Sequence, residues 1–188
     1  MKRFSILFFL VITVLSVQAR QPEQGYRGFV EWSNNVSSYT TPIGKFTDYF
    51  TGGSTSHGYQ INPWIYGGAG IVFEYCKNTG EYIFAPFADV RSDLKFGKFT
   101  PFVDARIGYN FTQYGDGLII TSKNGGVYFS PKVGYRINWG RKVGVNIGVG
   151  LTLVGYKNRY NWDSTTGTFL GVKNGCDSYF SFSLGFDF

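Results

Sequence analysis

The most regular arrangement of charged residues in this 188-residue chain is a repeated phrase. Asp89 and Arg91 follow one Pro-Phe pair, and Asp104 and Arg106 follow another at the same spacing. Between them, Gly97-Lys98 can form a two-residue type II′ turn. The hairpin that it closes sets Arg91 opposite Asp104. The same register sets Asp89 opposite Arg106, so all four side chains share one face. They could form a proton or ion path, but we favour neutralising pairs, because paired charges cost less to enclose than lone ones.

His57 is the only histidine, and Thr55 and Ser56 precede it. A catalytic base needs a hydroxyl group within about 3 Å and an orienting acid. In a strand, Ser56 points to the face opposite His57, and no acid lies on the same strand. Thr55 shares the face of His57 but is a poor nucleophile. We therefore expect His57 to be a polar residue in an aromatic-rich wall, and we expect no enzyme.

Two cysteines, Cys76 and Cys176, could form a disulfide in an oxidising compartment. We place them on the third and eighth expected strands, which are not neighbours, and on opposite faces. A disulfide needs Cα atoms within about 7 Å of each other, so a loop would have to fold over the mouth of the protein. The sequence leaves this disulfide open. No Cys/His cluster has the spacing of a metal site and no phosphate-binding loop is present, so we expect no metal and no cofactor.

The segment 157–174 interleaves cations with aromatic side chains. It contains Lys157, Arg159, Tyr160, Trp162 and Lys173, against the single acid Asp163. Such a segment could bind sugar or the phosphate of lipopolysaccharide. It could equally be an interfacial aromatic girdle with a solvated loop, which is the interpretation we favour.

Strand-like stretches recur along the chain with turn-forming residues between them. Aromatic residues make up 20% of the chain and glycine contributes 26 residues, a mixture that favours strands over helices. Eight strands are expected, at residues 25–34, 55–62, 64–75, 82–95, 100–113, 127–138, 143–156 and 175–188. Long connections at 34–54, 114–126 and 157–174 alternate with shorter ones. This alternation is typical of an up-and-down membrane barrel, with short turns in the periplasm.

Each expected strand has one apolar face and one small or polar face. An apolar outer wall in lipid around a wet interior explains this pattern. The interior would also receive Arg27, Glu31, Glu74, Lys132, Arg136 and Asp187. An eight-stranded interior is barely wide enough for its own side chains, so these charges would plug it. A secreted, lipocalin-like barrel with the two faces exchanged is the soluble alternative.

The first 19 residues have the pattern of a secretory signal peptide. Lys2 and Arg3 precede an apolar run at 4–17, and Val17-Gln18-Ala19 offers small side chains for cleavage. No cysteine lies near the cleavage point, so a lipoprotein anchor is not expected. Residues 20–188 then form a single domain. Its mild basic excess fits anionic lipid headgroups and does not indicate nucleic acid.

The last strand alternates regularly and ends with Phe186 and Phe188. It resembles the closing strand of bacterial outer-membrane barrels, whose C-terminal aromatic residue is recognised by the barrel-assembly machinery. The whole mature chain is similar to the small OmpA- and OmpX-like barrels of Gram-negative bacteria. Segments 56–63 and 102–109 look most like uncharacterised barrels of Bacteroides-type bacteria. The resemblance implies an all-β, eight-stranded antiparallel up-and-down transmembrane barrel in the outer membrane.

From these observations we expect a monomer with a plugged lumen, surrounded by outer-membrane lipids and lipopolysaccharide. Its role would be structural, or would be exerted at the cell surface through extracellular loops. Two alternatives stay open at this stage: a lipid-modifying outer-membrane enzyme, and a narrow channel or carrier for small hydrophobic molecules.

Overall fold

The structure of the protein is a computed structural model. It describes residues 24–41, 44–94, 98–116, 119–139, 143–162 and 169–188, with side chains except at 39–41, 112–116, 119–124, 158–162 and 169–173. The predicted signal peptide lies outside the described residues. Within the described part of the chain, no helix has the length and apolar character needed to cross a membrane.

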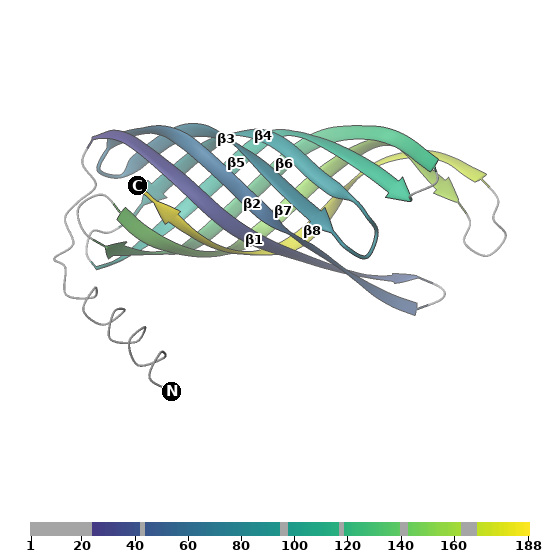
Figure 1. The fold of residues 1–188 in the computed structure, drawn as a ribbon, viewed down its shortest axis with the longest axis horizontal. Coiled ribbons are helices and arrows are strands. Elements are labelled where there is room, and N and C mark those ends of the chain that lie inside the picture. Colours follow the sequence, from purple (N-terminus) through teal and green to yellow (C-terminus); the bar gives the residue numbers. More distant parts are fainter. Residues whose placement is uncertain (1–23, 42–43, 95–97, 117–118, 140–142, 163–168) are drawn as a thin grey trace.

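Eight antiparallel strands close into a barrel, in which consecutive strands pair and β1 also pairs with β8 (Figure 1). The strands are β1 (Gly25–Thr41), β2 (Gly44–Asn62), β3 (Ile65–Cys76), β4 (Tyr82–Asp93), β5 (Phe99–Asp116), β6 (Ile119–Trp139), β7 (Val143–Trp162) and β8 (Phe169–Asp187). This topology confirms the predicted all-β, up-and-down barrel. We call the end of the barrel where Gly25 and Asp187 lie the turn end, and the opposite end the ribbon end.

Alternation along each strand separates the outer wall from the lumen. In β7, Val149 and Leu151 are exposed on the outside, whereas Asn146 and Thr152 are buried inside. In β4, Val90 is likewise exposed between two buried charged residues. An apolar outer wall around a polar interior is the arrangement of a barrel in lipid. It is the reverse of the lipocalin-like alternative, which is therefore wrong.

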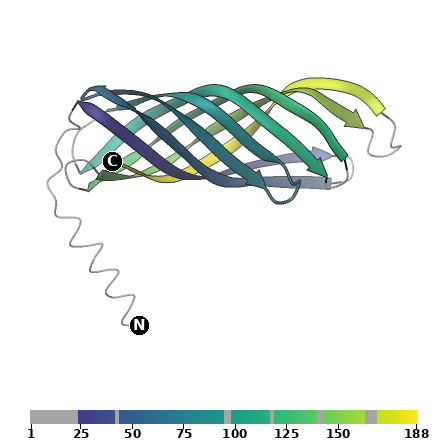
Figure 2. The same ribbon diagram turned by 45° about the horizontal axis from the view of Figure 1, so that its top comes forward.

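Three strand pairs continue where the sequence predicts long loops. The strands β1 and β2 occupy most of segment 34–54, β5 and β6 most of 114–126, and β7 and β8 much of 157–174. Because β1 pairs with β8 only from Phe29 to Val36, its outer part pairs with β2 alone and forms a two-stranded ribbon. Figure 2 shows the β1/β2 and β7/β8 ribbons projecting from the same end. The loop prediction failed because backbone hydrogen bonds carry this pairing, while these segments lack the regular apolar alternation that identifies a strand.

Candidate functional site

The central hairpin, formed by β4 and β5, has the predicted register. Arg91 faces Asp104 and Asp89 faces Arg106 across the strand pair. The backbone N–H of Leu94 donates to the Pro101 carbonyl oxygen at 2.8 Å, which continues this register toward the turn. Gly97 lies outside the described residues, so the two-residue turn at Gly97-Lys98 stays a prediction. All four charged side chains are buried inside the barrel.

Arg106 is the centre of the middle layer of the lumen. Its Nη2 lies 2.7 Å from Glu31 Oε2 and 3.3 Å from Asp104 Oδ2. Its Nε lies 3.7 Å from Asp89 Oδ2, so the predicted pair with Asp89 is present but longer than the pair with Glu31. Lys132 Nζ donates to the same Glu31 oxygen at 2.7 Å. The Glu31 carboxylate therefore joins β1, β5 and β6, and Arg106 adds β4 through Asp89.

Arg91 has partners other than the predicted one. Its Nε lies 3.1 Å from Asp93 Oδ1, and its Nη2 donates to Asn146 Oδ1 at 2.6 Å. Its guanidinium carbon lies 3.6 Å from the centre of the Phe102 ring. Among the described side chains, Arg91 and Asp104 form no ion pair, which corrects the prediction. Register brings the two Cα positions together, but a long side chain leans along its strand and can reach the next layer.

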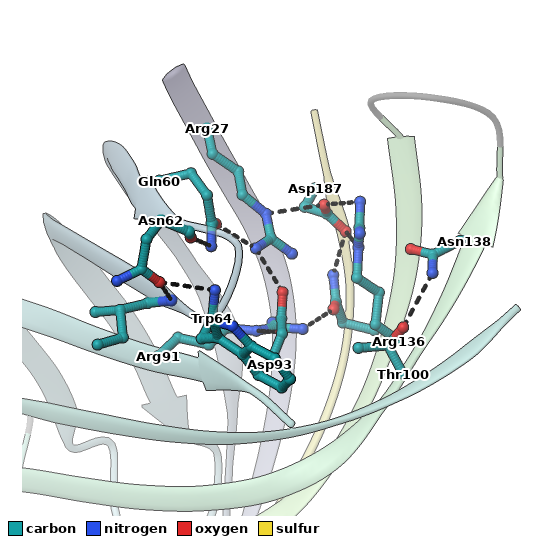
Figure 3. A network of polar contacts seen from close by, with 12 residues as sticks. Arg27, Gln60, Asn62, Trp64, Arg91, Asp93, Thr100, Arg136, Asn138 and Asp187 are labelled. Atoms are coloured by element: carbon teal, nitrogen blue, oxygen red, sulfur yellow. Dashed lines mark hydrogen bonds and ion pairs between the residues drawn. The ribbon is translucent and has the colours of Figure 1, made fainter. Parts of the chain in front are cut away.

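Asp187 is the centre of a second layer, at the turn end. Its Oδ2 lies 3.1 Å from Arg27 Nε and 2.6 Å from Arg136 Nη2. Its Oδ1 accepts a hydrogen bond of 2.9 Å from Asn146 Nδ2. Arg27 also contacts Asp93, at 2.8 Å. Figure 3 shows the side chains of Arg27, Asp93, Arg136 and Asp187 converging across the lumen from several strands. The sequence analysis missed Asp93, although its position two residues after Arg91 places it on the same face.

Glu74 differs from the other buried carboxylates of the described chain. Each of the others forms an ion pair with a described lysine or arginine, whereas Glu74 forms none within 4.0 Å. One oxygen accepts from the Ser33 hydroxyl at 2.5 Å, and the other from the Asn35 amide at 2.6 Å. The predicted placement of Glu74 in the lumen is therefore found, with neutral partners in place of a cation.

An apolar cluster fills the ribbon end of the lumen, where the sequence analysis expected a wet interior. Its buried members are Phe50, Val72, Cys76, Ile83, Ala85, Phe87, Tyr128, Val154 and Tyr179. Phe50 and Tyr179 pack edge to face, with ring centres 5.1 Å apart. The sequence of β4 does indicate this apolar cluster, because its inward positions change from charged residues to Phe87, Ala85 and Ile83 toward the ribbon end. We call this cluster the apolar cap.

His57 lies on the outer wall, and Ser56 lies inside, where its hydroxyl is 3.0 Å from the Tyr66 hydroxyl. The two residues thus point to opposite faces, as expected. His57 Nδ1 is 2.6 Å from the Tyr26 hydroxyl and Nε2 is 3.0 Å from Thr55 Oγ1. Thr55 donates its proton to the Phe29 carbonyl oxygen at 3.1 Å. In the neutral imidazole, Nε2 therefore donates to Thr55 and Nδ1 accepts from Tyr26, so both ring nitrogens have partners within the protein.

Both cysteines are free in the structure, so the disulfide that the sequence leaves open is not formed there. Cys76 is buried in the apolar cap, opposite Phe50 of β2. Cys176 is exposed and faces Gly155 of β7. The strands that carry the two cysteines are separated in the barrel, as the strand count predicts. The described residues also contain no group of three or more His, Cys, Asp or Glu side chains arranged to hold a metal ion.

The remaining predicted residues lie at opposite ends of the barrel. Phe186 is exposed on the outer wall, and the backbone of Phe188 exchanges hydrogen bonds of 2.9 and 3.0 Å with Gly28. A Cβ atom on Gly28 would lie 2.8 Å from the Phe188 ring, so this ring covers the glycine. At the ribbon end, Lys157 is exposed. The side chains of the other predicted cations and aromatics of segment 157–174 lie outside the described residues.

No protein-family model and no curated protein matches the chain. Among solved structures, the crystal structure of Neisserial surface protein A is similar, with a TM-score of 0.62 and 16% sequence identity. The match covers 87% of this chain and 96% of the Neisserial chain. The chain has the fold of a small outer-membrane β-barrel. At this identity the likeness shows the fold alone, and it agrees with the small OmpA/OmpX-like barrel expected from the sequence.

Proposed function

We propose that the protein is a monomeric outer-membrane barrel with a closed lumen, which acts as a structural component of the membrane or through its ribbons at the cell surface. The packing of the lumen carries this proposal. Two layers of ion pairs, centred on Arg106 and Asp187, are followed by the apolar cap. An eight-stranded barrel has little interior space beyond its own side chains. Ions would therefore have to displace both charged layers and cross the cap.

Several features support the location. Large apolar side chains cover the outer wall, which suits a hydrocarbon environment. The turn end would face the periplasm and the ribbon end the cell exterior, because short turns are periplasmic in barrels of this class. The predicted signal peptide (1–19) would direct export, and Phe186 and Phe188 would be read by the barrel-assembly machinery. Kinship with Bacteroides-type barrels, through segments 56–63 and 102–109, is part of this proposal.

The location is tested by fractionation. The mature protein should sediment with outer membranes and migrate faster on gels before heating than after it. Recovery as a soluble periplasmic monomer without detergent would contradict the proposal. Deleting Phe188 should reduce assembly more than a substitution in a ribbon.

A planar bilayer tests the closed lumen. The wild-type barrel should show no stable current of porin size. Replacing Phe87 and Tyr128 by alanine removes two large members of the apolar cap, and this variant should show more frequent brief openings while keeping its heat-modifiable mobility. Stable wild-type currents would favour the narrow channel instead.

The geometry around His57 supports a non-enzymatic role. Its two ring nitrogens are hydrogen-bonded to Tyr26 and Thr55, and Ser56 lies on the other side of the wall. A catalytic base needs a free nitrogen beside a nucleophile. Mass spectrometry of lipid A from a deletion strain should show the same species as the parent strain. A lost or gained acyl chain that returns on complementation would instead identify a lipid-modifying enzyme.

A further inference from the structure

The strands β1 and β8 separate at the ribbon end of the barrel. Their last pair joins Val36 to Phe180. Beyond it, β1 continues to Thr41 in contact with β2, and the part of β8 at 169–179 pairs with β7. Figure 1 shows the β1/β2 and β7/β8 ribbons diverging from the barrel wall. Within the described chain, residues 37–41 therefore have a neighbouring strand on one side only. We call this stretch the β1 edge.

The β1 edge lacks the features that usually protect such a strand. A sheet edge presents a row of backbone N–H and C=O groups, which proteins commonly block with lysine, with proline or with a covering loop. The β1 edge reads Ser-Ser-Tyr-Thr-Thr and contains neither lysine nor proline. The other edge of the same ribbon is covered, because Asn78 Nδ2 of the β3–β4 connection donates to the Thr47 carbonyl oxygen at 3.2 Å. The β1 edge is thus the side of this ribbon that can accept an added strand.

A pocket of about 490 Å³ lies beside the β1 edge. Ser37 and Ser38 line it from β1, and residues 176–179 line it from β8, so the pocket occupies the gap that the two strands leave. Its lining includes Tyr179, a member of the apolar cap. The pocket is therefore the outer mouth of the closed lumen. Its volume is within the range of about 300–1,000 Å³ that is usual for binding sites.

The charged side chains among the described lining residues are all acidic. They are Asp48 of β2, Glu81 of the β3–β4 connection and Asp177 of β8. All three are half-buried, and each has contacts within the protein. An ionised carboxyl group has about four acceptor positions, so it can also bind an added cationic donor. The whole chain has a formal net charge of +6, so an acidic mouth runs against its overall composition. A basic ligand matches this lining, whereas a phosphate group would be repelled.

We propose that the β1 edge binds an extended, basic peptide segment of a partner protein outside the cell. The segment pairs antiparallel with residues 37–41, in the place that β8 leaves, and carries lysine or arginine at alternate positions. Because alternate side chains of a strand share a face, every second side chain enters the pocket toward Asp48, Glu81 and Asp177. In strand addition, main-chain hydrogen bonds give affinity and pockets for alternate side chains give specificity. The exposure of this edge at the cell exterior rests on the outer-membrane location proposed above.

Fluorescence anisotropy with the purified barrel in detergent micelles tests the proposal. The probe is a labelled peptide that alternates lysine and threonine over four repeats. It should bind at least about tenfold more tightly than the glutamate–threonine analogue, the factor that one charged hydrogen bond contributes. A lysine–threonine peptide with N-methylated backbone amides keeps the charge but cannot pair as a strand, and it should lose affinity by a similar factor. Bound peptide should also slow the labelling of Cys176 by a maleimide, because Cys176 lines the pocket.

Variants of the mouth separate charge from folding. Asp48→Asn combined with Asp177→Asn should weaken binding of the lysine–threonine peptide at least about tenfold. The matched control combines Asp48→Glu with Asp177→Glu, which keeps both charges and should bind the peptide as the wild type does. Heat-modifiable gel mobility reports the folding of each variant.

Four results would overturn the proposal. They are no binding of the lysine–threonine peptide, equal binding of its N-methylated form, equal binding by the folded asparagine variant, and labelling of Cys176 that the peptide does not slow. Pairing of two barrels through their β1 edges, detected by analytical ultracentrifugation without peptide, would identify a second copy as the occupant and overturn it as well. Because these measurements use the purified barrel, they do not depend on the proposed location, which fractionation tests separately.

Discussion

Glu31→Leu should be among the most destabilising substitutions in the barrel. A single oxygen of Glu31 lies 2.7 Å from both Arg106 Nη2 and Lys132 Nζ, and all three side chains are buried. Removing the carboxylate leaves two enclosed cations. Their remaining ion pairs are with Asp104, at 3.3 Å from Arg106 and 4.0 Å from Lys132, and with Asp89, at 3.7 Å from Arg106. Breaking a buried ion pair on one side typically costs about 3–5 kcal/mol. Because Asp104 still compensates in part, we expect about 3 kcal/mol.

The double variant isolates the interaction. Lys132→Met alone leaves Glu31 with Arg106 and should cost about 1–2 kcal/mol, in the range of one lost charged hydrogen bond. In the Glu31→Leu background, the same change removes an unpaired cation and should recover about 1–2 kcal/mol. The free energies would then be clearly non-additive. Arg136→Met is the matched control, because Arg136 binds Asp187 in the other layer, so its effect should add to that of Glu31→Leu within about 0.5 kcal/mol.

The assay is reversible unfolding in urea, in phospholipid vesicles, followed by tryptophan fluorescence and by gel mobility without heating. A loss below about 1 kcal/mol for Glu31→Leu would show that luminal water screens the two cations and would refute the enclosed layer. Additivity of Glu31→Leu with Lys132→Met would show that the shared oxygen does not couple the two side chains.

Three further outcomes follow from the packing of the wall and the lumen. Gly52→Ala should block assembly, because a Cβ atom there would overlap the backbone of β3, whereas Gly53→Ala should assemble normally, and gel mobility compares the two. Equal assembly of both would contradict the close approach of β2 and β3. Phe87→Ala should lower the free energy of unfolding by about 3–5 kcal/mol through a cavity in the apolar cap, and a loss under about 1 kcal/mol would indicate a loosely packed cap. A maleimide should label exposed Cys176 in the folded protein but Cys76 only after denaturation, and peptide mass spectrometry that finds both labelled in the folded state would argue against this burial.

The sequence correctly predicts those features of the candidate site that depend on the two-residue alternation of a strand and on the sign of its charges. Alternation places Asp89 and Arg91 on one face of a strand, and the repeated phrase places Asp104 and Arg106 on the same face of the next. A shift of one strand by one residue would turn its two charges toward lipid, so the register is strongly determined by the pattern itself. The structure has this register.

The partners of these side chains were not predictable in the same way. Glu31 is far from Arg106 in sequence, yet closure of the barrel brings them to 2.7 Å. Arg91 binds Asp93 and Asn146 and does not pair with Asp104, the residue that it faces. Rules for cross-strand pairs between two neighbouring strands do not predict these contacts. The ribbons were missed for a related reason, since their pairing depends on the partner strand and not on an apolar face.

The sequence by itself determined the class of the fold and the two faces of its wall, because these depend on a period of two and on the preference of apolar groups for lipid. Only the tertiary structure decided how the lumen is divided, with charged layers below an apolar cap, and where the mouth of the barrel is hollowed beside the β1 edge. Both features arise between strands, from the side chains that closure and register set beside one another. Ser37 shows the difference: in the chain it lies in an expected long loop, and it becomes part of a strand edge beside a pocket only because β1 extends beyond its last pair with β8.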